Sequence, residues 1–115
     1  MPKDIVDIAG SFAPQGTSSP NPTSSGGEYV VTRSDVGTYV LTFNRAFSRF
    51  ICGTTQVQAH TLTPVMSQLG DFASTSPNRP ANITITVMLT ATGAATDIAA
   101  NANNQIHFRF TFLTV

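Results

Sequence analysis

The stretch QIHFRFTFLTV, residues 105–115, alternates apolar and polar side chains with a period of two. That period is typical of a half-buried β-strand, in which successive side chains point to opposite faces of a sheet. One face carries a wall of apolar side chains, formed by Ile106, Phe108, Phe110 and Phe112. The other face carries Gln105, His107, Arg109 and Thr111. The sequence therefore predicts a strand that is paired inside a sheet and is needed for folding.

Three other segments have the composition of regular strands. Residues 81–90 alternate cleanly and are expected to point four side chains inward: Ile83, Ile85, Val87 and Leu89. Residues 28–33 and 38–43 are both rich in strand formers, and the four residues between them, 34–37, read as a turn. Two strands joined this tightly predict a hairpin, with Tyr39, Leu41 and Phe43 on one face of its second strand.

The remaining segments of the second half are less regular. Residues 47–61 predict two strands or one bent strand, with a bulge or bend at 52–54. Residues 62–80 predict the longest loop, with one helical turn over 64–69 that ends at Gly70. Residues 91–104 predict a loop of small residues with a brief helix over 96–100, for which Thr96 would be the N-cap.

The order of these segments indicates an all-β fold. Strands follow one another without alternating helices, which favours an antiparallel β-sandwich or jelly roll of six to eight strands over residues 28–115. The chain has 115 residues, enough for one domain with a real core and too few for two. Lys and Glu, which favour helices, each occur once, as Lys3 and Glu28.

Residues 1–27 have a different character and are predicted to form an extended N-terminal arm and linker. Residues 14–27 contain three prolines and almost no apolar side chain, which is linker composition. The apolar residues ahead of the linker need a surface to cover them, and they are Ile5, Val6, Ile8 and Phe12. Two alternatives are open: the segment returns to its own sheet as a strand, or it docks on a neighbouring subunit or another protein.

Charge and composition exclude several classes of function. Charged residues make up 10% of the chain and the formal net charge is zero, so no cationic face is available to grip a nucleic acid. An uncharged polar surface is common where partners cover the protein, because such groups are less costly to desolvate than charges. The first residues lack the apolar segment of a signal peptide, and no apolar run is long enough to span a membrane. The single Cys52 rules out an internal disulfide and indicates synthesis in a reducing cytoplasm.

Candidate catalytic groups are few. The motifs of serine hydrolases, phosphate-binding loops and zinc proteases are missing, so we expect no enzyme activity, no cofactor and no small-molecule substrate. Cys52 could be a nucleophile with His60 or His107 as its base, but its strand context favours a buried small side chain. The two histidines could meet at a metal, yet no carboxylate lies at ligand spacing, which favours outward polar positions.

The other polar residues have structural interpretations. Asp35, Asp71 and Asp97 fall in predicted turns, where Asp commonly bonds to the backbone. Arg49 and Arg109 lie within predicted strands, at the surface or across a subunit contact. Asn82 matches a glycosylation acceptor, but it lies in a strand of a chain without a secretion signal, so we expect no glycan there.

Several segments resemble the small β-domains of tailed-phage virions. The resemblance covers residues 28–115 and is carried by the segments 37–43, 83–89, 99–101 and 106–110. Such jelly-roll proteins occur as capsid decoration, or cement, proteins and as the heads of tail fibres.

What the resemblance implies is a structural virion protein. It would sit on the capsid surface as a homotrimer, after synthesis in the host cytoplasm, and clamp neighbouring subunits of the major capsid protein. Ile5, Val6, Ile8 and Phe12 would then bind an adjacent subunit, and many weak copies would strengthen the shell together. The alternative is a receptor- or carbohydrate-binding head, with its specificity in residues 62–80 and 91–104, although the chain has no Trp to form a sugar platform.

Overall fold

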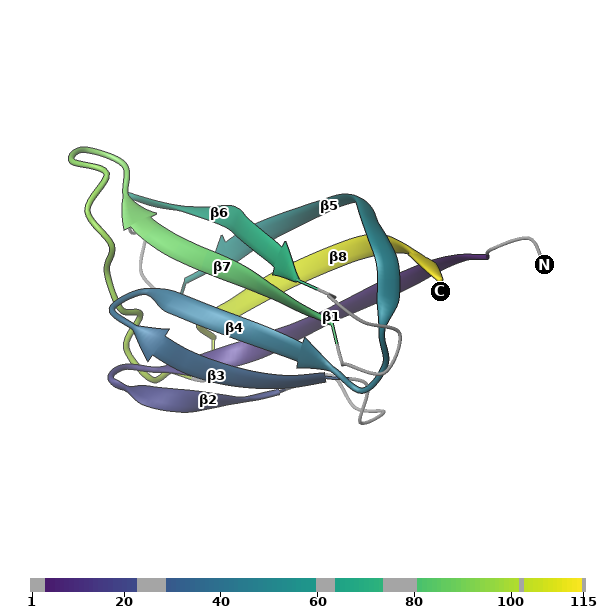
Figure 1. The fold of residues 1–115 in the computed structure, drawn as a ribbon. Helices are drawn as coiled ribbons and strands as arrows, with labels where there is room; N and C mark the ends of the chain where they lie inside the picture. Colours follow the sequence, from purple (N-terminus) through teal and green to yellow (C-terminus); the bar gives the residue numbers. More distant parts are fainter. Residues whose placement is uncertain (1–3, 23–28, 60–63, 74–80, 102, 115) are drawn as a thin grey trace.

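The protein is an antiparallel β-sandwich of two four-stranded sheets, which lie face to face in the computed structural model (Figure 1). The structure describes residues 4–22, 29–59, 64–73, 81–101 and 103–114. Its eight strands are β1 (Ile5–Gln15), β2 (Ser18–Pro22), β3 (Tyr29–Asp35), β4 (Thr38–Phe43), β5 (Phe47–Gln58), β6 (Val65–Ala73), β7 (Asn82–Leu89) and β8 (Gln105–Thr114). The predicted all-β sandwich is confirmed, while the jelly-roll connectivity stays a prediction.

Sheet A has the strand order β2-β1-β8-β5, so the strand that opened the sequence analysis lies at its centre. β8 pairs with β1 from Ile5 opposite Leu113 to Phe12 opposite Ile106, and with β5 on its other side. The predicted inward face of β8 is confirmed, because all four of its apolar side chains are buried: Ile106, Phe108, Phe110 and Phe112.

Sheet B has the order β3-β4-β7-β6 and contains the predicted hairpin and the predicted strand over 81–90. Tyr39, Leu41 and Phe43 of β4 are buried together, as their shared face predicts. Ile83, Ile85 and Val87 of β7 are fully buried opposite them, whereas Leu89 at the end of the strand is only half-buried.

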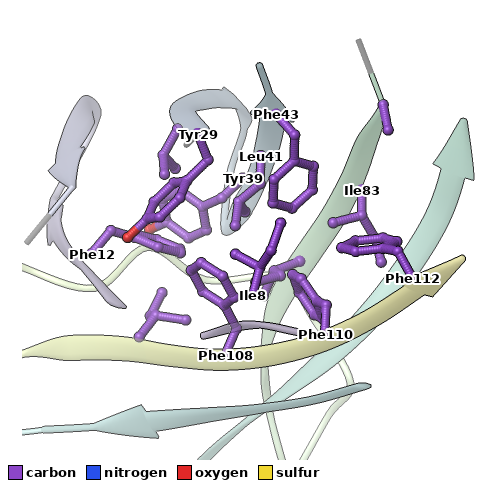
Figure 2. Close-up of a cluster of buried hydrophobic side chains, with 14 of the residues drawn as sticks. Ile8, Phe12, Tyr29, Tyr39, Leu41, Phe43, Ile83, Phe108, Phe110 and Phe112 are labelled. Carbon is purple, nitrogen blue, oxygen red and sulfur yellow. The ribbon is translucent and has the colours of Figure 1, made fainter. Parts of the chain in front are cut away.

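The core between the sheets is built largely from aromatic rings (Figure 2). Phe112 of β8 stacks on Phe47 with their ring centroids 4.2 Å apart, and it meets the edge of Phe43 at 5.2 Å. Tyr29 lies edge-on to Phe108 at 5.1 Å. Such pairs add about 0.5–1.5 kcal/mol each beyond the area they bury, so they fix how the two sheets face each other.

The N-terminal segment belongs to this sandwich, which corrects the expectation of an extended arm for residues 5–22. β1 lies between β2 and β8, and Ile8 and Phe12 are buried in the core. The Phe12 ring lies 5.2 Å from that of Tyr39, so β1 brings its own core residue to sheet B (Figure 2). Of the two alternatives left open by the sequence, the structure shows the strand that returns to its own sheet.

The predicted helical turn over 64–69 is wrong, because β6 is a strand paired with β7. Its side chains alternate between half-buried and exposed as far as Leu69, and the register shifts between Leu69 and Phe72. Residues 96–100 also contain no helix, and Ala95 forms an isolated bridge with Met88 instead. Of the alternatives for 47–61, β5 is one irregular strand, but its register shifts lie between Phe47 and Arg49 and between Phe50 and Cys52, ahead of the predicted 52–54.

Candidate functional site

Cys52 is exposed, so its predicted burial is wrong. The register shift after Phe50 changes the phase of β5 and places Cys52 opposite Thr111, on the outer face of sheet A. His107 lies on the same face opposite Gln56, four residues further along the strand. At about 3.3 Å per residue the two are about 13 Å apart, too far for a thiolate and its base.

His107 is held by a neighbouring amide. Its Nε2 lies 2.7 Å from Gln58 Oε1, a hydrogen bond in which the ring nitrogen donates if it carries the proton. His60, the other predicted metal ligand, lies outside the described residues. Within the ranges that the structure describes, no three His, Cys, Asp or Glu side chains come close enough to hold a metal ion.

The outer face of sheet A carries few charged side chains. The registers of β1, β8 and β5 bring small and polar side chains together there, among them Ala9, Ser11, Thr54 and Gln56. Arg109 lies on this face 3.8 Å from Asp7, and both side chains are more than half exposed. Such a pair adds little stability, but it cancels the two charges. Arg49, opposite Leu113 of β8, is exposed as expected.

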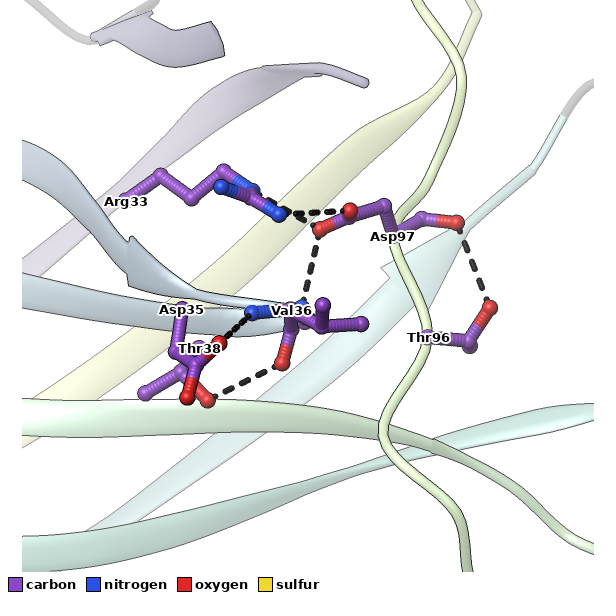
Figure 3. A network of polar contacts seen from close by, with 7 residues as sticks. Arg33, Asp35, Val36, Thr38, Thr96 and Asp97 are labelled. Atoms are coloured by element: carbon purple, nitrogen blue, oxygen red, sulfur yellow. Dashed lines mark hydrogen bonds and ion pairs between the residues drawn. The ribbon is translucent and has the colours of Figure 1, made fainter. Parts of the chain in front are cut away.

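Asp97 forms a polar junction with Arg33 and the backbone of Gly37 (Figure 3). Arg33 Nε and Nη2 donate to its two carboxylate oxygens at 3.0 and 2.8 Å, and Gly37 N donates at 2.8 Å. The Arg33 hydrogen bonds and then the Gly37 N–H lower the pKa of Asp97. The junction ties the 91–104 loop to the β3–β4 hairpin. Asp97 does bond to the backbone, as predicted, but at a distant turn, and its ion pair with Arg33 was not predicted.

The other two turn acids differ from each other. Asp35 accepts a hydrogen bond from Val36 N at 2.7 Å, which is the predicted local role (Figure 3). Asp71 is exposed in β6, at the register shift after Leu69, and therefore lies in a strand rather than in the predicted loop.

The candidate binding site is a groove between the edge strands β5 and β6, here called the β5–β6 groove. It has a volume of about 710 Å³, within the roughly 300–1,000 Å³ usual for ligand sites. Its described lining contains no acid, Lys or Arg and comprises Thr55, Gln56, Val57, Gln58, Val65, Met66, Ser67 and His107. Among the described atoms, the buried Thr55 Oγ1 has no hydrogen-bond partner.

Beside the groove, the core is incompletely covered. Six apolar side chains pack against the core while remaining partly exposed, and five of them belong to β5 and β6: Phe50, Val57, Val65, Leu69 and Phe72. The matching inward residues of the central strands are fully buried. The β5–β6 side of the sandwich can therefore accept a further covering element.

Sequence reasoning missed this groove because it interpreted one wall as a loop. The outward Met66 is apolar and the inward Ser67 is polar, which hides the alternation of β6. The other wall of the groove comes from residues 51–59, and their lack of charged side chains could have indicated a binding surface in the sequence.

Together, these features define an antiparallel β-sandwich with one uncharged lateral groove. Comparison with known proteins found no matching family model, no matching curated protein and no matching solved structure. The described residues contain no helix that is long and apolar enough to cross a membrane.

Proposed function

We propose that this chain is a structural virion protein that decorates and stabilises a phage capsid by binding across neighbouring subunits of the major capsid protein. The observation that carries the proposal is the outer face of sheet A, where Asp7 and Arg109 neutralise each other among small polar side chains. Uncharged polar groups are desolvated at low cost when a large protein surface covers them. The resemblance adds the expectation of three copies around an axis.

The structure changes which residues of the N-terminal segment are free to bind. Ile8 and Phe12 are occupied in the core of their own chain, and Val6 packs partly against it. Ile5 is 67% exposed and remains available for a contact with a capsid subunit. The proposed attachment therefore uses the outer face of sheet A with Ile5 at its margin, in place of a free arm.

A binding titration with empty expanded capsids tests the proposal. The capsids would be assembled from the major capsid protein encoded in the same genome, and saturable binding is expected. Ala9→Glu places a charge at the centre of the outer face, opposite Arg109 in register, and should weaken binding at least tenfold. Val30→Glu, at a 62% exposed position of sheet B, is the matched control and should bind like the wild type.

A second candidate is a receptor- or carbohydrate-binding head, and the β5–β6 groove favours it. The groove offers hydroxyl and amide groups beside Val57, Val65 and Met66, a combination that suits a neutral, hydrogen-bonding ligand. Reproducible binding on a glycan array that is lost in Gln58→Ala would support the head. Saturable capsid binding with a blank array would support decoration.

A further inference from the structure

We infer that the β5 edge is a self-association surface, at which β5 of a second copy of this chain pairs antiparallel with it and extends sheet A. The surface comprises Cys52–Gln58, where the register of β5 with β8 is unbroken. In the part of the chain that the structure describes, no strand pairs with the other side of this run. The inference is independent of the proposed capsid binding.

The edges of the other outer strands carry features that discourage pairing. An exposed edge offers unpaired N–H and C=O groups to any other strand, and natural proteins block it with charges, prolines, bulges or short length. β2 is five residues long and contains Pro20 and Pro22. β3 carries Arg33 and Asp35 with a register shift between them.

The first half of β5 is blocked in the same way, and the register shift in β6 leaves it an unbroken uncharged run of only five residues, 65–69. β6 carries Asp71 at its register shift, and β5 carries Arg49 between its two shifts. The run Cys52–Gln58 has no charge, no proline and no bulge, so it lacks each of these devices. Identical uncharged edges meet without repulsion, which makes a second copy a suitable occupant.

The side chains fit an antiparallel pair centred on Thr55. Thr55 is the midpoint of the run, so a twofold axis there sets it opposite its own copy and sets Val57 opposite Gly53. Facing threonines in a sheet can hydrogen-bond to each other, and the Thr55 hydroxyl, which is buried without a partner among the described atoms, would reach its copy after a rotation about χ1. Val57 would lie beside Gly53, which has no side chain to clash with it, because the rings of Phe110 and Phe50 already occupy the place of a Cβ there.

The pairing would join the two sheets A into one continuous sheet of eight strands, four from each copy. It would also bring a second copy against the partly covered side chains of β5, such as Phe50 and Val57. This twofold contact is distinct from the threefold axis of the proposed trimer, and closed assemblies can contain both kinds of axis.

Sedimentation equilibrium of the full chain over a concentration series tests the inference. Wild type should associate by twofold steps, and Gln56→Lys should raise the dissociation constant at least tenfold, because lysine on an edge opposes strand pairing. The control is Thr32→Lys on β3, an exposed position at another edge, and its association should match the wild type. A monomer at all concentrations, or an oligomer equally stable in Gln56→Lys, would overturn the inference.

Cysteine cross-linking tests the register in folded samples. In a Cys52→Ser background, Thr55→Cys should form a disulfide between two copies under mild oxidation, because facing residues of an antiparallel pair have Cα atoms about 4.5–5.5 Å apart. Thr54→Cys should not cross-link, since it would face Gln56 of the second copy. Equal cross-linking at both positions would contradict the pairing. A trimer unaffected by these changes would still leave the capsid proposal standing.

Discussion

Phe12 gives the sharpest test of whether the N-terminal segment is a core strand or a dispensable arm. Its side chain is fully buried between the sheets, with its ring 5.2 Å from that of Tyr39 (Figure 2). Truncating a buried Phe to Ala removes the transfer free energy of the ring and leaves a cavity, at a cost of about 3–5 kcal/mol. Domains of this kind have free energies of unfolding of about 5–15 kcal/mol, so Phe12→Ala should remove a large part of the stability of the protein.

Urea unfolding followed by far-UV circular dichroism and tyrosine fluorescence measures this loss. With a slope of about 1–3 kcal/mol per molar urea, a change of about 4 kcal/mol moves the midpoint by about 1.3–4 M. Phe12→Leu keeps most of the apolar volume and should cost about 1–2 kcal/mol, which gives a folded variant if the alanine variant does not fold.

Ile5→Ala is the matched control on the same strand. Ile5 is 67% exposed, so its truncation should change the free energy of unfolding by less than about 0.5 kcal/mol. If Phe12→Ala is as stable as Ile5→Ala, then β1 contributes nothing to the fold, and the segment is an arm after all.

Three further predictions concern the 91–104 loop, the hairpin turn and the β5 edge. The pKa of Asp97 is lower in the folded than in the unfolded protein. Its ionised carboxylate therefore stabilises the fold fully above the unfolded pKa, which is near 4, and this stabilisation is lost as the pH falls towards the folded pKa. In urea unfolding measured at successive pH values, Asp97→Asn should reduce the loss of stability at acid pH. Gly37→Ala should lower the free energy of unfolding by at least about 2 kcal/mol, because Gly37 has a φ of 61° and an added Cβ would meet a backbone oxygen at 2.5 Å. Gly16→Ala is the control and should cost only about 1 kcal/mol, because Gly16 has a φ of 64° but open space around it. Equal losses for the two variants in thermal or urea unfolding would contradict the packing argument. Cys52 should react with a thiol reagent in the native dilute protein as fast as in urea, and strong native protection would show that it is covered.

The strands with clean alternation could be predicted from sequence, and the irregular ones could not. β4, β7 and β8 bury every second side chain, so their pattern survives in the sequence. β6 was missed because Gly70 and Asp71 form an irregularity that ends its alternation, and a short apolar run with breaks fits a helical turn equally well. β2 was missed because its prolines and serines have the composition of a linker, although a short edge strand tolerates proline.

The candidate site was harder to predict than the fold, because it depends on which strands become neighbours. The β5–β6 groove exists because two edges meet, and no local pattern records that pairing. Cys52 was predicted on the wrong face because a single register shift after Phe50 inverts every later residue of β5. The absence of charge along residues 51–59 is visible in the sequence, but it indicates an open edge only once the structure places β5 at the edge of sheet A.

The central place of β8 in sheet A sets the order in which the chain can fold during synthesis. β3, β4, β6 and β7 are made before it and can pair as sheet B, whereas β5 has no partner in sheet A until β8 is made and β1 has only the short strand β2. β1 must therefore wait until residues 16–113 have been translated, at roughly 5–20 residues per second, before Ile5 can meet Leu113. During that interval Ile8 and Phe12 lack their sheet, so the ribosome-bound chain is the form of this protein that is most exposed to chaperones and aggregation.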